Sequence, residues 1–212
     1  MARTDGRIER GNRTRQLVLR RTVDIASVEG LEALSVGRLA LELDLSKSGV
    51  FALFGSKQEL QLATVREAAR IFTERVVLPA LATLPGVGRL WQLCDLWLEY
   101  SRGRVFPGGC FFYEVIAEFD ARSGPVHDAV LQSQRDWTAH VEGTVEEAKS
   151  AGELLPDIDA GQLAFELVAL METANMISVL HNEEEISYGR ARAGIRARLR
   201  AAAVDPALVP GS

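Results

Sequence analysis

Basic side chains gather at the N-terminal end of a chain whose total charge is −5. Residues 1–21 hold seven arginines against Asp5 and Glu9, which gives +5. Residues 1–57 carry ten basic and seven acidic side chains, or +3, and the other 155 residues carry 14 basic and 22 acidic, or −8. Because guanidinium and ammonium groups neutralise phosphates and release counterions, a polyanion such as DNA would bind at the N-terminal end. The acidic remainder would repel DNA and favour one orientation of approach.

The side chains that could ligate a metal or attack a substrate are few and scattered. His127, His140 and His181 each lack a second ligand three or four residues away, so no zinc pattern is present. Cys94 and Cys110 are too far apart for a CxxC motif and too few for a disulfide scaffold, which favours a reducing cytoplasm. No set of nucleophile, base and orienting residue is recognisable. We therefore expect no catalytic residue, no metal and no cofactor.

Two short helices with a tight break between them are expected over residues 35–54. Ser35 is placed as the N-cap of the first, in which apolar residues recur at three- and four-residue spacing. Ser46 is placed as the N-cap of the second, which ends at Gly55. A third helix starts with the capping box Ser56 to Glu59. Two short helices joined by a turn of about three or four residues form a helix-turn-helix.

This stretch resembles the DNA-binding domain of TetR-type transcriptional regulators over residues 16–62. The positions that agree in type and spacing are Ser35-Val36, Leu39-Ala40, Leu45-Ser46-Lys47, Phe51, Phe54 and Ser56 to Leu60. The chain departs from the family where Asp44 replaces a usual glycine, Ser48-Gly49 replaces Gly-Thr, and Leu53 replaces an aromatic residue or histidine. Asp44 preserves the turn, because aspartate tolerates the left-handed backbone conformation better than most residues.

The resemblance implies an all-α homodimer that binds a palindromic operator in double-stranded DNA, as a repressor released by a small apolar molecule. It implies a DNA-binding domain at residues 1–56, with a basic N-terminal arm, and a ligand-binding and dimerisation domain at 57–204. The second helix of the motif would enter the major groove with its first residues nearest the base edges, while Ser35, Arg38 and Lys57 hold phosphates. The residues expected to contact DNA are Ser35, Arg38, Ser46, Lys47, Ser48, Gly49, Phe51 and Lys57.

The segments that flank the motif are expected to be helical, except at the chain ends. Residues 1–12 fit a flexible basic arm, because two glycines and an asparagine interrupt any helix pattern. A disordered terminus and an arm that reaches a DNA groove are both compatible with this composition. A helix over 13–28 would pack behind the motif, and a connecting helix of about 20 residues would run on to Pro79. Residues 205–212 are expected to fray.

The second domain is expected to consist of helices at 89–103, 110–119, 126–151, 160–180 and 187–202. The first of these is apolar on several sides, which predicts that other helices enclose it. The helix at 160–180 carries two apolar stripes, one of Leu163, Leu167, Leu170, Met171, Ala174 and Ile177, and one of Phe165, Val168, Met176 and Val179. The last helix has small residues, Gly194 among them, on the face of Tyr188. These two helices are the expected dimer interface, a four-helix bundle with their copies.

Aromatic side chains concentrate in the middle of a chain that is only 7% aromatic. Each one taken alone is more often part of a core than of a binding site. Together with a few polar groups they also fit a ligand cavity, and Gly108-Gly109 provides a hinge beside them. The residues expected to line a site for a small-molecule effector are Trp91, Trp97, Tyr100, Cys110, Phe111, Trp137, Met171 and Asn175.

Length and hydrophobicity are those of a soluble protein of one or two domains, with 212 residues of which 47% are hydrophobic. No stretch approaches the roughly 18 apolar residues of a membrane span, and the N-terminus lacks the hydrophobic core of a signal peptide. We expect a cytoplasmic protein with no membrane partner. The alternative to a DNA-binding regulator is a helical small-molecule-binding protein or enzyme that does not bind DNA.

Overall fold

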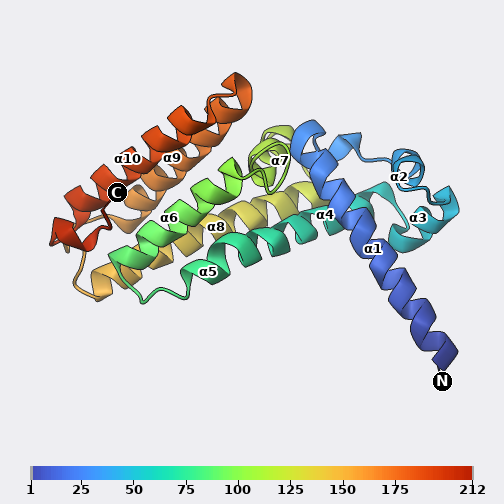
Figure 1. Ribbon diagram of the computed structural model, residues 1–212, viewed down its shortest axis with the longest axis horizontal. Coiled ribbons are helices and arrows are strands. Elements are labelled where there is room, and N and C mark those ends of the chain that lie inside the picture. Colours follow the sequence, from blue (N-terminus) through green and yellow to red (C-terminus); the bar gives the residue numbers. More distant parts are fainter. Residues whose placement is uncertain (1, 212) are drawn as a thin grey trace. The chain divides into compact units, whose positions relative to one another are not determined.

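The computed structural model describes residues 2–211, with side chains from residue 11 onward, and the fold is all-α as expected (Figure 1). No β-strand occurs in the described part of the chain. Two compact units are present. Unit 1 consists of Met1–Arg70 and Phe106–Gln132, and unit 2 consists of Ile71–Val105 and Ser133–Ser212. The expected DNA-binding region, residues 1–56, falls wholly in unit 1; a functional boundary at residue 56 remains a prediction.

Unit 1 is built on the long helix α1. Its elements are α1 (Ala2–Glu29), the 3-10 turn η1 (Leu31–Ala33), α2 (Val36–Glu42), α3 (Lys47–Phe54), most of α4 (Lys57–Phe72), α7 (Phe111–Phe119) and the start of α8 (Pro125–Ser150). One face of α1 is buried, with Val18 and Ala26 fully enclosed. Thr64 of α4 donates a hydrogen bond of 2.9 Å to the hydroxyl oxygen of Thr22, so the polar groups on this buried face are paired.

The N-terminal end of α1 corrects one expectation. The helix begins at Ala2 and continues through Gly6 and Gly11, so the prediction of a flexible arm over residues 1–12 is wrong for the described residues 2–12, while residue 1 lies outside them. Each glycine weakens a helix by about 1 kcal/mol relative to alanine, but glycine keeps the backbone N–H that proline would remove. Two glycines therefore lower the stability of this end without breaking it.

The connecting helix contains a change of helical type. After α4 the chain forms a π-helical segment, η2 (Thr73–Val77), and then the short α5 (Leu78–Ala80). Pro79 has no N–H to donate, and its ring would collide with the carbonyl four residues earlier in an α-helix, so a widened turn just before it relieves that conflict. The long connecting helix predicted to end near Pro79 is thus present.

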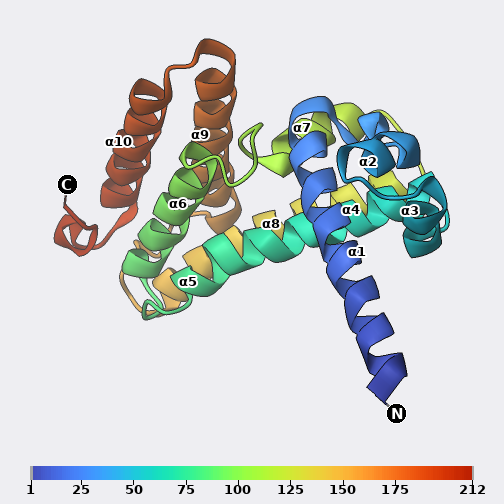
Figure 2. The ribbon, with the colours of Figure 1, turned by 45° about the vertical axis from the view of Figure 1, so that its right-hand side comes forward.

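Unit 2 holds the remaining helices, α6 (Val87–Arg102), the rest of α8, α9 (Ala160–His181) and α10 (Glu184–Ala202), and the 3-10 turn η3 (Pro206–Leu208). Helices α9 and α10 run side by side in both ribbon views, and α6 packs against each of them (Figures 1 and 2). Helix α10 begins three residues before the predicted start at Ser187. Asp159 caps α9 as the sequence indicates, since its side chain accepts a hydrogen bond from Gln162 N.

The two apolar stripes of α9 have different surroundings within the chain. Leu163, Leu167 and Met171 of the first stripe are fully buried in unit 2, while Leu170 and Ile177 of the same stripe are half-buried. Phe165 and Met176 of the other stripe are exposed. With apolar residues on both sides, α9 is long and apolar enough to cross a membrane by length and composition alone. The expectation that no such stretch exists was wrong, because it counted uninterrupted apolar runs. A core helix of a soluble protein passes the same test.

The C-terminal tail is held in place through Val209, so the prediction of a frayed end is wrong for residues 205–209. Asp205 caps η3 by accepting a bond from Ala207 N, and the Val209 side chain is only 1% exposed. Val204 N donates a 2.9 Å hydrogen bond to Glu153 O, which fixes the segment after α10 to the loop before α9. Burial of one valine and these backbone bonds hold the tail in place.

Candidate nucleic-acid interface

Helices α2 and α3 form the predicted helix-turn-helix, and the predicted caps hold both of them. Ser35 Oγ accepts a bond from Arg38 N, and Ser46 Oγ accepts one of 3.0 Å from Gly49 N. Asp44 takes a left-handed conformation with φ +52°, as expected for the residue that replaces a glycine in the turn. Gly55 ends α3 with φ +77°, and Ser56 Oγ accepts a bond from Glu59 N at the start of α4.

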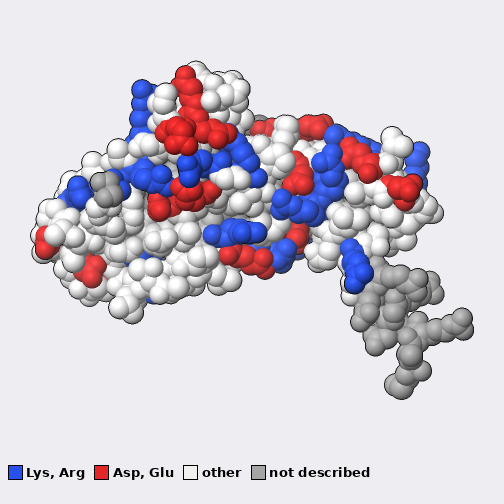
Figure 3. Space-filling model, viewed as in Figure 1, with Lys and Arg blue, Asp and Glu red and all other residues white. Residues whose placement is uncertain are grey.

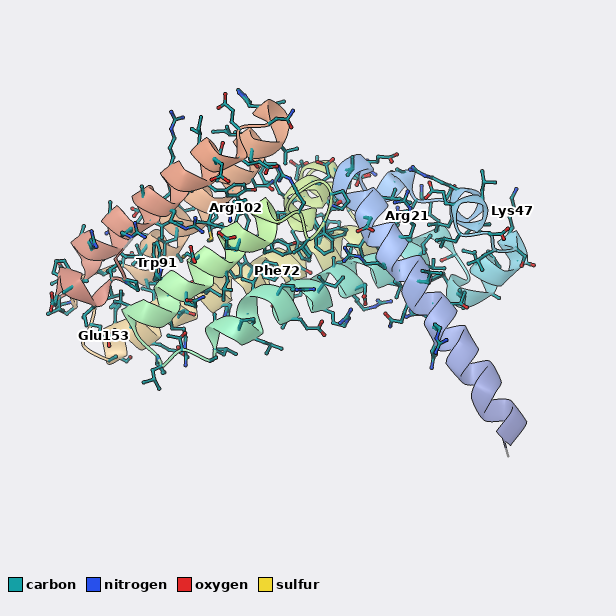
Figure 4. The ribbon with its side chains drawn as sticks, in the orientation of Figure 1. Arg21, Lys47, Phe72, Trp91, Arg102 and Glu153 are labelled. Carbon is teal, nitrogen blue, oxygen red and sulfur yellow. The ribbon has the colours of Figure 1, made fainter. Side chains whose placement is uncertain are left out.

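The first turn of α3 is open to solvent. Ser46, Lys47, Ser48 and Gly49 are all exposed, and Lys47 lies at the outer end of the α2–α3 pair (Figure 4). A Cβ at Gly49 would lie 2.9 Å from Ser46 Oγ, so glycine leaves room for the capping hydroxyl. The positive end of the helix dipole and the free N–H groups of this turn favour an anion or the edge of a base.

One face of α3 packs inside unit 1, and the opposite face is exposed and available for contact with a partner. Val50 and Phe54 are buried in unit 1 and anchor the helix. Phe51, in contrast, exposes 54% of its surface on the outer side. Leu53 is half-buried, so the position that carries an aromatic residue or histidine in the resembled family is an apolar packing position here.

Arg38, one of the predicted phosphate contacts, belongs to an ion-pair network between α1 and α2. Its guanidinium donates two bonds of 2.7 Å to the Glu29 carboxylate and one of 2.7 Å to Glu42. Arg21 Nε donates to the other oxygen of Glu42 at 2.5 Å. Hydrogen bonds from Arg38 lower the pKa of Glu29, and bonds from Arg21 and then Arg38 lower the pKa of Glu42. Positive and negative groups therefore alternate over this surface (Figure 3).

Lys57, another predicted phosphate contact, also forms hydrogen bonds within the chain. Its ammonium donates to the backbone oxygen of Glu32 at 2.7 Å and to the Glu32 carboxylate at 2.8 Å. Gln61 and Arg122 approach the same carboxylate. The hydrogen bonds from Lys57 and Gln61 lower the pKa of Glu32. Sequence reasoning missed these acidic partners, because a carboxylate distant along the chain gives no local signal.

The residues predicted to line an effector site are divided between the two units. Cys110 and Phe111 belong to unit 1, at the start of α7. The other six lie in unit 2: Trp91, Trp97, Tyr100, Trp137, Met171 and Asn175. All eight are buried except Trp137, which is half-buried.

Aromatic rings within unit 2 contact one another around Phe72, a residue that sequence reasoning did not assign to this site. The Phe72 ring lies 5.4 Å from that of Tyr100 and 5.1 Å from that of Trp137, both in edge-to-face geometry. Trp97 lies 6.5 Å from Tyr100. Trp91 is elsewhere in the unit, where the Arg196 guanidinium lies 4.7 Å above its ring. The predicted set is therefore only partly a single cluster.

A cluster of four buried polar side chains links α6, α9 and α10: Ser101, Asn175, Ser178 and Tyr188. Ser101 Oγ donates to Asn175 Oδ1 at 2.8 Å and lies 2.7 Å from Tyr188 Oη. Ser178 Oγ also donates to Tyr188 Oη, at 3.0 Å. Arg104, which has φ +47°, donates to the Glu184 carboxylate at 2.9 Å. Asn175 is the one member of this group that the sequence indicated.

Burial shifts the pKa of several titratable groups in the described residues. No group of three or more potential ligands is present in that part of the chain. Burial raises the pKa of the Cys94 thiol to about 12, so Cys94 is a neutral, unreactive thiol at physiological pH. Burial lowers the pKa of His140 and raises that of Glu172. Desolvation is the largest cause of each of these shifts.

Comparison with solved structures places the fold among known regulators. A TetR transcriptional regulator from Chloroflexus aurantiacus is 23% identical with a TM-score of 0.83, and the match covers 92% of this chain and 98% of that one. A regulator from Saccharomonospora viridis, solved with choline, is 21% identical with a TM-score of 0.75 and coverages of 92% and 99%. AibR, solved with isovaleryl coenzyme A and operator DNA, is 14% identical with a TM-score of 0.67 and coverages of 85% and 95%. At these identities the likeness shows a shared fold.

Sequence comparison assigns the family. No protein of curated function matches the chain. The family model described as the C-terminal domain of tetracyclin repressor-like proteins matches residues 86–195, which is slightly more than half of the chain. That match lies outside the helix-turn-helix, so it is independent of the motif that suggested the family. The chain therefore belongs to the tetracyclin repressor-like (TetR) family of DNA-binding transcriptional regulators.

Proposed function

We propose that this regulator is a homodimeric repressor whose α3 helices read a palindromic operator and which a small, mostly apolar molecule releases from DNA. The exposed, capped first turn of α3, with Lys47 and Ser48 at its tip, is the observation that carries the proposal. Such a turn fits the major groove, where the first residues of a recognition helix meet base edges. The test is electrophoretic retardation of the DNA upstream of its own gene, with Lys47→Ala as the comparison. Binding that shows no preference for this DNA over random DNA would argue against an operator there.

The side chains of the motif divide into two roles in this proposal. Lys47 and Ser48 contact bases, and the bare backbone at Gly49 permits close approach. Ser35, Arg38 and Lys57 contact phosphates. The Arg38 and Lys57 side chains already form ion pairs with carboxylates of the same chain. The exposed ring of Phe51 suits an apolar contact, such as one with a thymine methyl group.

Dimerisation is proposed to use the outward faces of α9 and α10. On α9, Phe165 is 68% exposed and Leu180 is 74% exposed, which is an unusual amount of apolar surface for one helix. On α10, Ile186 is exposed beside the small side chains of Ala193 and Ala197, which would let a second helix approach closely. A second copy of the chain would cover both faces in a four-helix bundle.

Gly194, which was expected at the interface between copies, also packs against α9 of its own chain. Its Cα faces Leu170 of α9 in the same chain, with 3.4 Å between an added Cβ and the Leu170 side chain. Tyr188, Ala191 and Ile195, on the same side of α10, are buried within unit 2. The small residue at 194 thus serves packing within the chain, and the proposed contact between copies moves to the face of Ala193.

An effector is proposed to bind near the aromatic and polar residues of unit 2. Trp97, Tyr100 and Phe72 offer apolar walls, and Asn175 with Ser101 offers hydrogen-bonding groups. Choline in the Saccharomonospora viridis protein and isovaleryl coenzyme A in AibR show that similar folds accept small molecules. The identity of the effector for this chain is a matter for screening, in which apolar compounds come first.

The competing reading, a helical binding protein or enzyme without a role on DNA, gains no support from a specific residue. The family consists in general of regulators that are not enzymes. We propose a cytoplasmic location, because the operator is there. Retardation of operator DNA by the purified protein separates the two readings directly.

A further inference from the structure

Glu118 of α7 binds the backbone just before the helix-turn-helix. Its Oε2 accepts a hydrogen bond of 2.6 Å from Leu31 N, and its Oε1 accepts one of 2.9 Å from Glu32 N. Both amides belong to η1, which ends two residues before the N-cap Ser35. A single carboxylate therefore satisfies two successive backbone donors that lie far from it in sequence.

The backbone at Gly30 is shaped for this carboxylate. Gly30 is buried with φ +79°, a conformation that favours glycine, and an added Cβ would lie 2.6 Å from Glu118 Oε2. Successive N–H groups after such a residue form a concave site for an anion. Here the anion is a side chain of the protein, so the site fixes one segment of unit 1 to another.

A second contact fixes the other end of the same segment. Gly108 N donates a hydrogen bond of 3.2 Å to Ser27 Oγ in the last turn of α1. A Cβ at Gly108 would overlap the backbone oxygen of Ser27. Between the two contacts, Phe111 and Val115 of α7 are fully buried. Helix α7 is thus held at both ends against the segment that leads into α2.

We propose that Glu118 is a positioning residue for DNA recognition, which sets the direction of the helix-turn-helix by holding η1. The inference rests on the proposed function of this chain as an operator-binding regulator. Reading of bases requires α3 in one orientation, whereas non-specific binding depends mainly on phosphate contacts and tolerates several. Loss of the two bonds would let η1 and α2 sample other orientations. The free-energy cost of ordering η1 and α2 would then lower the affinity for operator DNA and leave the affinity for other DNA unchanged.

Unit 2 offers a matched control. Glu153 Oε2 accepts a 2.7 Å bond from Val87 N, and Gly86, with φ +143°, would clash with the Glu153 carboxylate if it carried a Cβ. This pair resembles Glu118 with Gly30, except that Glu153 accepts one backbone bond and Glu118 accepts two, and it caps α6 in unit 2. Glu153→Gln and Gly86→Ala should therefore reproduce any general loss of stability without a specific effect on recognition.

The experiment compares Glu118→Ala, Glu118→Gln and Gly30→Ala with the two control variants. Full-length proteins are titrated with a duplex that the wild type selected from a random library, and with an unselected duplex of equal length. Thermal unfolding of each variant is recorded in parallel. Gly30→Ala displaces the carboxylate without removing it, so it tests the same contact by a different change.

We expect the ratio of selected to unselected affinity to fall about tenfold in the Glu118 and Gly30 variants, in line with the loss of hydrogen bonds to a charged group. Affinity for the unselected duplex and its salt dependence should stay unchanged. The Glu153 and Gly86 variants should keep the wild-type ratio even where their unfolding temperature falls. If the ratio of selected to unselected affinity is the same in all five variants, whether at the wild-type value or below it, the positioning role of Glu118 is overturned. A wild type that selects no sequence would instead contradict the proposed function itself.

Discussion

Lys57 donates two hydrogen bonds to Glu32, one to its backbone oxygen and one to its carboxylate, at 2.7 and 2.8 Å. Lys47, on the exposed first turn of α3, has no hydrogen-bond or ion-pair partner in the described part of the chain. Before DNA binds, the two lysines therefore differ in whether a carboxylate of the chain is paired with them. Lys57 is oriented and partly neutralised, while Lys47 keeps its full charge and its freedom to reach a base.

The first prediction separates base recognition from phosphate binding. Lys47→Ala should weaken binding to the operator more than binding to random DNA, because the change removes a group at the tip of α3. Lys57→Ala should weaken binding to both DNAs and lower the salt slope by about one. Titrations at several salt concentrations measure both effects. Equal losses for the two variants on both DNAs would remove this division of roles.

The second prediction concerns the carboxylate that holds Lys57. Glu32→Gln keeps an oxygen that can accept from the ammonium but removes a negative charge close to where phosphate is expected. Affinity for all DNA should rise, and the salt slope should steepen by a small fraction of about one, since Lys57 already contributes to the slope in the wild type and would only lose its partial compensation. Glu147→Gln is the control, because Glu147 pairs with Arg89 in unit 2 at the same distance of 2.8 Å. An unchanged affinity in Glu32→Gln would mean that phosphate already displaces the carboxylate.

The third prediction tests the dimer interface with two neighbouring residues. Ala193 is exposed on the outer face of α10, so Ala193→Trp should separate the copies while leaving the fold of each chain intact. Gly194→Trp should instead lower the unfolding temperature, because a large side chain would collide with Leu170 of the same chain. Sedimentation and thermal unfolding distinguish the two effects. A wild type that sediments as a monomer at micromolar concentration would contradict the interface.

Local patterns of the sequence predicted most of the helices and their caps. Ser35, Ser46 and Ser56 cap the helices that they were expected to cap, because a cap depends on residues three positions apart. The helix over residues 13–28 was predicted, but its extension back to Ala2 was missed, since Gly6 and Gly11 suggested a break whose cost the rest of α1 outweighs.

Contacts between distant segments could not be predicted in this way. Nothing around residue 118 indicates that its side chain caps residues 31 and 32, and nothing around residue 32 indicates a bond with Lys57. The face of α10 with Gly194 was assigned to the contact between copies, because Gly194 and Ala193 are both small and differ by only one position along the helix. Only the packed chain decides which of them is internal.

The fourth prediction concerns pH. Half-burial lowers the pKa of His140 below its ordinary value of 6.5, against an opposing effect of the nearby Glu147 and with a smaller contribution from Arg89. Between the lowered folded pKa and 6.5 the unfolded chain binds more protons, so the free energy of unfolding falls as pH decreases through that window. His140→Gln should remove this part of the pH dependence. Urea unfolding from about pH 8 to about pH 5 measures it, and an identical slope in the variant would exclude His140 as its source.

The fifth prediction concerns the effector and uses the intrinsic fluorescence of the chain. Trp91 and Trp97 are buried, whereas Trp137 is half-buried and contacts Phe72 at the edge of the aromatic cluster. A ligand that enters this cluster should therefore change the emission of Trp137 most. In a screen of apolar compounds, Trp137→Phe should lose most of the emission change that a hit produces, while Trp91→Phe should keep it.

A hit of this kind acts as an effector only if it binds the free form more tightly than the DNA-bound form, because a ligand indifferent to the two states shifts no equilibrium. A tenfold release from the operator requires about 1.4 kcal/mol of such differential binding, which one apolar ligand can supply. Titration of each hit into the protein–operator complex measures the release. If hits raise the unfolding temperature but leave operator affinity unchanged, the cluster binds ligands without controlling DNA. If no hit changes the emission of Trp137, the effector site lies elsewhere in the chain.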